Sequence, residues 1–110
     1  MSALTAPITA SASGDNVVVA GMPNYAIRVL GYVISFAGAV NARWMSDVLG
    51  GAVALTGQLT GVAAGTNITA SVVGANARGW FQTAPGKALN LNLSGAVQVN
   101  GHVLWELVSQ

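Results

Sequence analysis

The chain has 110 residues, of which 53% are hydrophobic and only 6% are charged, and its formal net charge is +1. This length fits one compact domain, and the absence of cysteine excludes disulfides and thiolate chemistry. Four basic and three acidic residues cannot form the basic stripe that nucleic-acid binding requires, so we expect no nucleic-acid partner.

Short apolar runs alternate with turn signals along the whole chain, which is typical of β-structure. Strands are predicted over residues 6–13, 16–20, 25–36, 40–47, 52–59, 66–73, 79–83, 88–94 and 102–108. Residues 43–49 are the only stretch that could form a helix instead. The pattern predicts an all-β fold, an antiparallel β-sandwich or jelly roll of about eight or nine short strands. We expect residues 1–13 to form an N-terminal arm and residues 14–110 a single domain.

The longest predicted strand, residues 25–36, has two apolar faces. Strict alternation places Ile27, Val29 and Val33 on one face, and Leu30 and Tyr32 on the other. A sandwich strand ordinarily buries one face only. Two explanations remain open: a loop or arm of the same chain covers the second face, or the second face is a subunit interface.

One turn signal, the most apolar stretch and the N-terminal residues complete the local predictions. Asn100-Gly101 predicts a two-residue hairpin turn, because both positions of that turn require positive φ. The most apolar stretch, residues 26–40, is shorter than the roughly 20 residues of a membrane-spanning helix and contains Arg28, so we expect no membrane association. Residues 1–7 lack the basic and apolar regions of a signal peptide, which predicts synthesis in the cytoplasm.

Candidate catalytic and metal-binding groups are few. The three acidic residues, Asp15, Asp47 and Glu106, lie in different predicted segments, and the single histidine, His102, follows the predicted turn. A metal site needs three or four ligands at suitable spacing, and no glycine-rich phosphate-binding motif is present. We therefore expect no enzyme activity, no metal and no cofactor. A small hydrolase would require His102 to contact a serine or a carboxylate in a cleft.

The remaining candidates are contact residues. The aromatic side chains can fill the core or, where exposed, anchor an interface. Arg28 and Arg43 lie on otherwise apolar strands, so we expect each to pair with Asp47 or Glu106, within the chain or across an interface. The candidate interface residues are Leu4, Pro7, Ile8, Arg28, Tyr32, Arg43, Trp44, Arg78, Trp80 and Trp105.

Three segments carry a resemblance to known proteins: residues 79–103 (Gly-Trp-Phe-Gln-Thr-Ala-Pro-Gly-Lys onward), residues 28–35 and residues 6–14. In these segments the chain resembles small proteins encoded among the structural genes of tailed bacteriophages. The resemblance implies a virion protein of the capsid cement or decoration type, with a β-sandwich or jelly-roll fold. Such proteins bridge the major capsid protein subunits on the outside of the phage head.

We accordingly expect a structural virion protein, made in the host cytoplasm and located on the capsid surface. Its expected partners are copies of itself, as a homotrimer, and the phage major capsid protein. The scarcity of charge independently favours an assembled protein, because free domains normally carry an interspersed charged surface. We expect residues 2–13 to reach a neighbouring chain as an added strand. The alternative is a tail or head-fibre adhesion module that binds host glycan through exposed aromatic residues.

Overall fold

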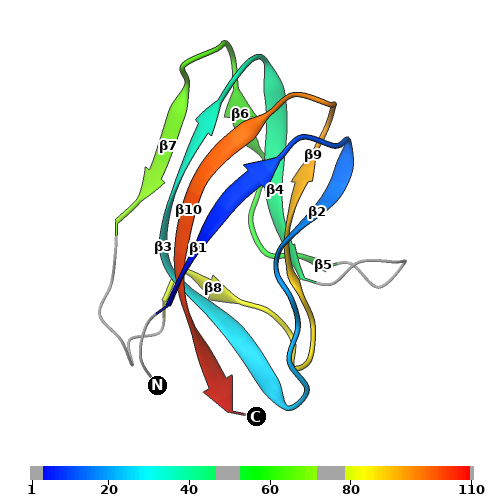
Figure 1. Cartoon of the computed structure of the whole chain (residues 1–110), viewed down its shortest axis with the longest axis vertical. Coiled ribbons are helices and arrows are strands. Elements are labelled where there is room, and N and C mark those ends of the chain that lie inside the picture. Colours follow the sequence, from blue (N-terminus) through cyan, green and yellow to red (C-terminus); the bar gives the residue numbers. More distant parts are fainter. Residues whose placement is uncertain (1–3, 47–52, 72–78, 110) are drawn as a thin grey trace.

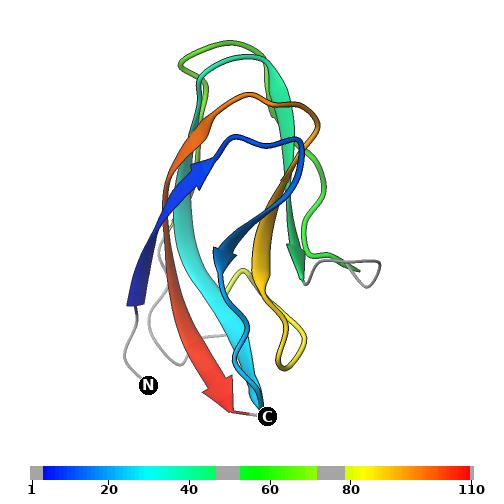
Figure 2. The same cartoon turned by 45° about the vertical axis from the view of Figure 1, so that its right-hand side comes forward.

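Two antiparallel sheets pack face to face in this computed structural model, which describes residues 4–46, 53–71 and 79–109 (Figures 1 and 2). Sheet A contains β1 (Leu4–Ala10), β10 (Val99–Ser109), β3 (Tyr25–Phe36), β7 (Asn67–Ala70) and β8 (Phe81–Gln82). Sheet B contains β2 (Gly14–Val19), β9 (Leu89–Leu93), β4 (Val40–Ser46), β5 (Val53–Ala54) and β6 (Leu59–Gly61). The predicted all-β antiparallel sandwich is confirmed. Residues 43–46, which could have formed a helix, belong to β4.

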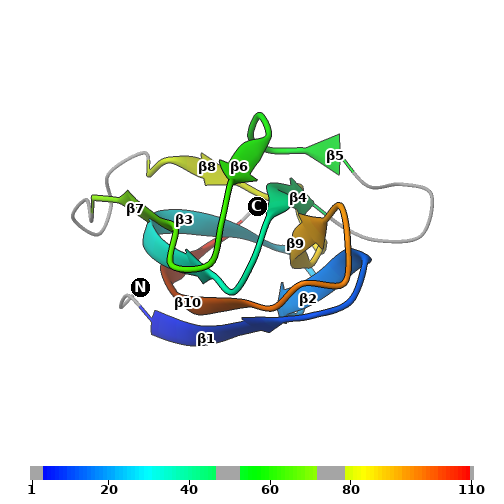
Figure 3. The same ribbon diagram turned by 90° about the horizontal axis from the view of Figure 1, so that it is seen from above.

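Most strands that follow each other along the chain lie in opposite sheets. Sheet A has the order β1-β10-β3-β7, with β8 also paired to β3, and sheet B has the order β2-β9-β4-β5, with β6 also paired to β4. The chain therefore crosses between the layers after β1, β2, β3, β6, β8 and β9, as the view from above shows (Figure 3). Local hairpins contribute little to either sheet, so most strand pairs join segments that are distant in sequence.

One edge strand of each sheet is split into two pieces. On sheet A, β7 pairs with residues 32–35 of β3 and β8 pairs with Arg28 and Val29, so Leu30 and Gly31 lie between the two pieces. On sheet B, β6 pairs with residues 40–42 of β4 and β5 pairs with Met45 and Ser46. Each split leaves a position where the outward surface of the sheet is not continued by a paired strand.

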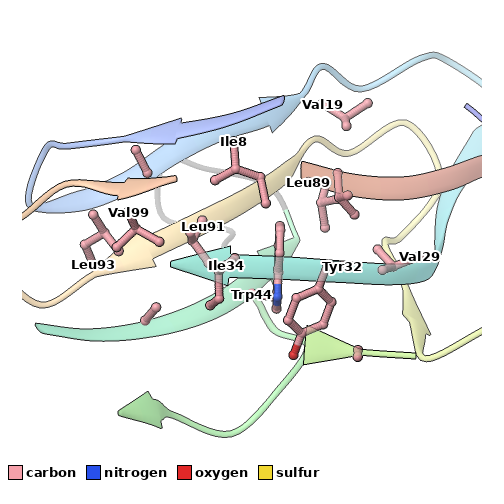
Figure 4. Close-up of a cluster of buried hydrophobic side chains, with 14 of the residues drawn as sticks. Ile8, Val19, Val29, Tyr32, Ile34, Trp44, Leu89, Leu91, Leu93 and Val99 are labelled. Carbon is pink, nitrogen blue, oxygen red and sulfur yellow. The ribbon is translucent and has the colours of Figure 1, made fainter. Parts of the chain in front are cut away.

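The core lies between the sheets and is organised around Trp44, which is fully buried (Figure 4). The ring centroids of Tyr32 and Trp44 are 5.2 Å apart in an edge-on arrangement, and that of Phe81 is 6.0 Å from Trp44. The alternating leucines of β9, Leu89, Leu91 and Leu93, are also buried, as strict alternation predicts. The aromatic cluster supplies the volume that a core rich in alanine and valine lacks.

A β-bulge in β3 changes which of its residues face the core, compared with the strict alternation expected from the sequence. Leu104 and Trp105 of β10 are adjacent, but their partners Gly31 and Val29 are not, so Leu30 is the extra residue. Core-facing positions consequently change from Ile27 and Val29 before the bulge to Tyr32, Ile34 and Phe36 after it. The prediction that Tyr32 and Val29 lie on opposite faces was wrong. The bulge shifts the core-facing positions of β3 by one residue. Much of what looked like a second apolar face in the sequence therefore faces the same core.

The predicted turn at Asn100-Gly101 is also wrong. Both residues lie inside β10, where Gly101 is paired with Ile8 on one side and Ile34 on the other. Gly101 has φ of 150°, and a Cβ at this position would overlap the carbonyl oxygen of Val33. Glycine is needed here for the close approach of β3 to β10, a requirement that the local sequence does not distinguish from a turn.

The N-terminal segment forms part of the sandwich. Residues 4–10 are strand β1, which pairs along its whole length with β10 of the same chain. Ile8 and Ala10 lie in the core at 1% exposure each. An arm reaching a neighbouring chain would have to give up this pairing and this burial.

Candidate functional site

A hollow lies on the outer face of sheet A, and we call it the sheet A hollow. It has a volume of about 320 Å³. Its lining residues are Thr5, Gly31, Tyr32, Val33, Thr69, Ala70, Ser71, His102 and Leu104.

The register of sheet A explains why these residues meet. His102 of β10, Val33 of β3 and Thr69 of β7 are directly opposite one another across the strands. Two residues along β10, Leu104 is opposite Thr5 of β1 and Gly31 of β3. The hollow lies beside the split between β7 and β8, because no paired strand covers Gly31 on that side among the described residues.

The lining of the sheet A hollow is mostly apolar and carries no carboxylate, ammonium or guanidinium group. Burial raises the pKa of the Tyr32 hydroxyl, which therefore remains neutral at neutral pH. Val33 and Leu104 are among the apolar side chains in this lining. A hollow of this kind suits an uncharged or apolar group, and His102 is the one imidazole in its lining.

One ion pair lies on the same face of sheet A. The Arg28 Nη1 atom is 3.1 Å from Glu106 Oε2, and Glu106 is buried while Arg28 is partly exposed. Arg28 also donates to Gln82 Oε1 at 3.4 Å. The pair confirms Glu106 as one of the two partners expected for Arg28. The two charges of this pair compensate each other on the described part of the outer face of sheet A.

Trp80 lies at the split between β7 and β8. Its side chain is 52% exposed, and its Nε1 donates to the Ser71 carbonyl oxygen at 2.7 Å. Its backbone N–H donates to the Val29 carbonyl oxygen at 2.8 Å. These two bonds hold a large exposed aromatic surface next to Ser71, which lines the sheet A hollow. Exposed tryptophan in a fixed position is characteristic of contact hot spots.

The other expected contact residues are divided between surface and core. Leu4 is 46% exposed, and Pro7 lies exposed beside His102. Ile8 and Trp44 are buried in the core and therefore offer no surface to a partner, and Trp105 packs against the core from a partly buried position. Arg43 lies on the outer face of sheet B. Arg78 lies outside the described residues.

Sequence reasoning missed Thr5, Val33, Thr69, Ser71 and Leu104 as lining residues. Threonine and serine on a predicted strand are ordinary outward positions, and nothing local marks them as neighbours. Val33 was placed on an apolar face of its strand, which was the available signal. Their juxtaposition depends on the pairing of β1, β10, β3 and β7, which are far apart in the chain.

The structure does not assemble a catalytic group among the residues it describes. His102 is exposed on sheet A, Asp15 lies on sheet B, and Glu106 is bound to Arg28. Within the described ranges no three histidine or acidic side chains lie close enough to hold a metal ion.

No protein-family model, curated protein or solved structure matches this chain. In the part of the chain that the structure describes, no helix has the length and hydrophobicity needed to cross a membrane.

Proposed function

We propose that the protein is a structural subunit of a phage particle, a decoration protein that binds the assembled head through the outer face of sheet A. The observation that supports this most directly is the uncharged, mostly apolar sheet A hollow next to the exposed Trp80. Arg28 and Glu106 compensate each other's charge. The other charged side chains in the described ranges are Asp15, Arg43 and Lys87. Such a surface suits a protein that works while covered by other chains.

Strand connectivity favours the same class of protein. If β5 and β6 count as one interrupted strand and β7 and β8 as another, each sheet has four strand positions. The order is then first, eighth, third, sixth in sheet A and second, seventh, fourth, fifth in sheet B, which is the order of a jelly roll. We propose a jelly roll on this basis. The architecture is common among capsid proteins, although fold by itself does not assign function.

The mechanism is passive binding. Each copy contributes an apolar contact of modest area, and many copies bound to a repeating lattice together stabilise the shell. As a homotrimer the protein would engage several major capsid protein subunits at once, which raises the effective concentration at each contact.

Charge substitution at the hollow tests the docking face. Thr69 is exposed and its side chain lines the hollow, so Thr69→Glu places a carboxylate in the apolar contact without disturbing the core. We expect Thr69→Glu to lower binding to particles lacking the protein by at least about tenfold, because a charge buried without a partner is costly. Co-sedimentation of purified protein with such particles measures this.

Ser13→Glu is the matched control, because Ser13 is exposed in the connection between β1 and β2, away from the hollow. It adds the same charge and should bind like the unsubstituted protein. Equal binding of all three proteins would show that the outer face of sheet A is not the docking face. Absence of the chain from purified particles, measured by quantitative mass spectrometry, would contradict the decoration function itself.

The second candidate function is glycan binding by a tail or head-fibre module, which the exposed Trp80 favours. The copy number per particle separates the two. A decoration protein occurs in numbers comparable to the major capsid protein, whereas a tail module occurs in numbers comparable to other tail proteins. Binding of the free protein to a glycan array, abolished by Trp80→Ala, would support the tail module instead.

A further inference from the structure

A second hollow lies on the outer face of sheet B and has the opposite character. This Arg43 hollow is lined by Asn41, Ala42, Arg43, Gln58, Asn92 and Ser94 and has a volume of about 90 Å³. It lies beside the split between β5 and β6, where Arg43 and Trp44 are not paired to either piece. Its lining is mainly polar, in contrast to the sheet A hollow.

Arg43 is incompletely satisfied in this setting. Its Nε atom is shielded from solvent and has no hydrogen-bond partner. The terminal nitrogens are not enclosed in the same way, and within the described ranges no acidic side chain forms an ion pair with Arg43. A guanidinium that has lost part of its hydration without gaining a partner is electrostatically costly, and an anion relieves that cost.

The neighbouring groups are neutral hydrogen-bond donors held in place by the sheet. Asn92 lies between Asp15 and Arg43 in the register, and its Nδ2 donates to Asp15 Oδ1 at 2.8 Å. Ser94 Oγ accepts the Asn41 backbone N–H at 3.0 Å, which leaves the Ser94 hydroxyl hydrogen free to donate elsewhere. Among the acidic side chains that the structure describes, Asp15 lies on the same sheet as Arg43, and Asn92 separates the two in the register.

We infer that the Arg43 hollow binds a carboxylate group carried by an aspartate or glutamate of a partner protein. A carboxylate has the planar geometry that a guanidinium binds through two parallel hydrogen bonds. The volume of about 90 Å³ corresponds to roughly three water molecules. That space accommodates a carboxylate head group, whereas a sugar ring is too large for it.

A protein surface fits the neighbourhood of the hollow. Val17 is 57% exposed on the same face and lies in register with Asn90, two residues along β9 from Asn92. A partner segment whose carboxylate enters the hollow would also cover this apolar side chain. The choice of a protein partner rests on the proposed function, because it assumes that the chain works in an assembly. The preference for a carboxylate does not depend on it.

Titration of the free protein with sodium acetate tests the site, with sodium chloride at equal ionic strength as the reference. We expect saturable changes in the NMR signals of the Arg43 guanidinium and of the Asn92 and Gln58 side-chain amides, with a roughly millimolar dissociation constant. Arg43→Gln should abolish them, and Arg43→Lys should weaken them because the two-point geometry is lost. Lys87→Gln, which removes the same charge elsewhere, should leave them unchanged.

Asp15→Asn should tighten acetate binding about twofold. The substitution removes a negative charge that repels acetate from roughly 10 Å away in water. Acetate changes that do not saturate, or that persist unchanged in Arg43→Gln, would overturn the site. An N-acetyl glutamate amide should bind at least as tightly as acetate, and tighter binding of glucuronate would overturn the protein partner. These arms use the free protein, so their result is independent of whether the chain is found on particles.

Discussion

In the Arg28–Glu106 pair, the burial of Glu106 makes its charge depend on Arg28 for compensation. Glu106 is 2% exposed, one of its oxygens lies 3.1 Å from Arg28, and the other has no hydrogen-bond partner. Such a pair contributes little net stability, because removing two charges from water costs nearly as much as their attraction returns. Loss of only one partner is a different matter, since it leaves a buried charge uncompensated.

We therefore expect Arg28→Met to destabilise the protein by about 3 kcal/mol or more, because Glu106 would be buried without its partner. The double variant Arg28→Met/Glu106→Leu should recover most of that loss. Urea unfolding of the two single variants and the double variant measures the coupling. If the double variant is as unstable as the sum of the single variants, the two side chains do not act as a pair.

Among the elements, β10 is the one on which sheet A depends. It is a continuous strand between β1 and β3, and at Gly101 the β3 backbone leaves no room for a Cβ. Its partner β3 carries the bulge at Leu30, which changes the buried face partway along the strand. The β3–β10 pair thus contains both a close backbone contact at Gly101 and a β-bulge at Leu30.

The close approach predicts a large difference between two glycine substitutions. Gly101→Ala should destabilise the protein by about 2 kcal/mol or more, because the new methyl group would overlap the Val33 carbonyl oxygen. Gly57→Ala, where a Cβ meets nothing within 4 Å, should change stability by less than about 0.5 kcal/mol. Thermal unfolding of both variants is sufficient, and comparable stabilities would contradict the packing described for β10.

Much of the strand pattern could be predicted from the sequence, and the register could not. Alternating leucines predict β9 because a half-buried strand imposes a period of two. Residues 25–36 were assigned as a strand with the observed ends. Alternation cannot detect a bulge, however, since the extra residue depends on the partner strand. The same limit explains Asn100-Gly101, where local turn preference was overridden by pairing on both sides.

At the scale of the whole molecule, the two outer faces differ in character. Sheet A presents an apolar hollow beside Trp80, and sheet B presents a small polar hollow around Arg43. Both hollows occur where an outer strand is split, so the same topological feature produces two different surfaces. This asymmetry suits a subunit that contacts unlike neighbours on its two sides.

Self-association is the prediction at this scale. With 6% charged residues, we expect the purified protein to form a homo-oligomer, a trimer, because so little charge opposes contact between copies. Sedimentation velocity over a range of concentrations measures the mass. A protein that remains monomeric at the highest concentration reached would contradict the inference from charge.

The sequence by itself determined the class of structure, which is one small domain of two packed β-sheets with few charged residues. These properties follow from composition and from the period of two, which are local and additive along the chain. Only the tertiary structure decided which residues line the two hollows, that Ile8 and Trp44 are core residues, and that Arg28 meets Glu106. Those results depend on strands brought together from distant parts of the chain, and pairing between distant strands is set by the packing of the whole sandwich.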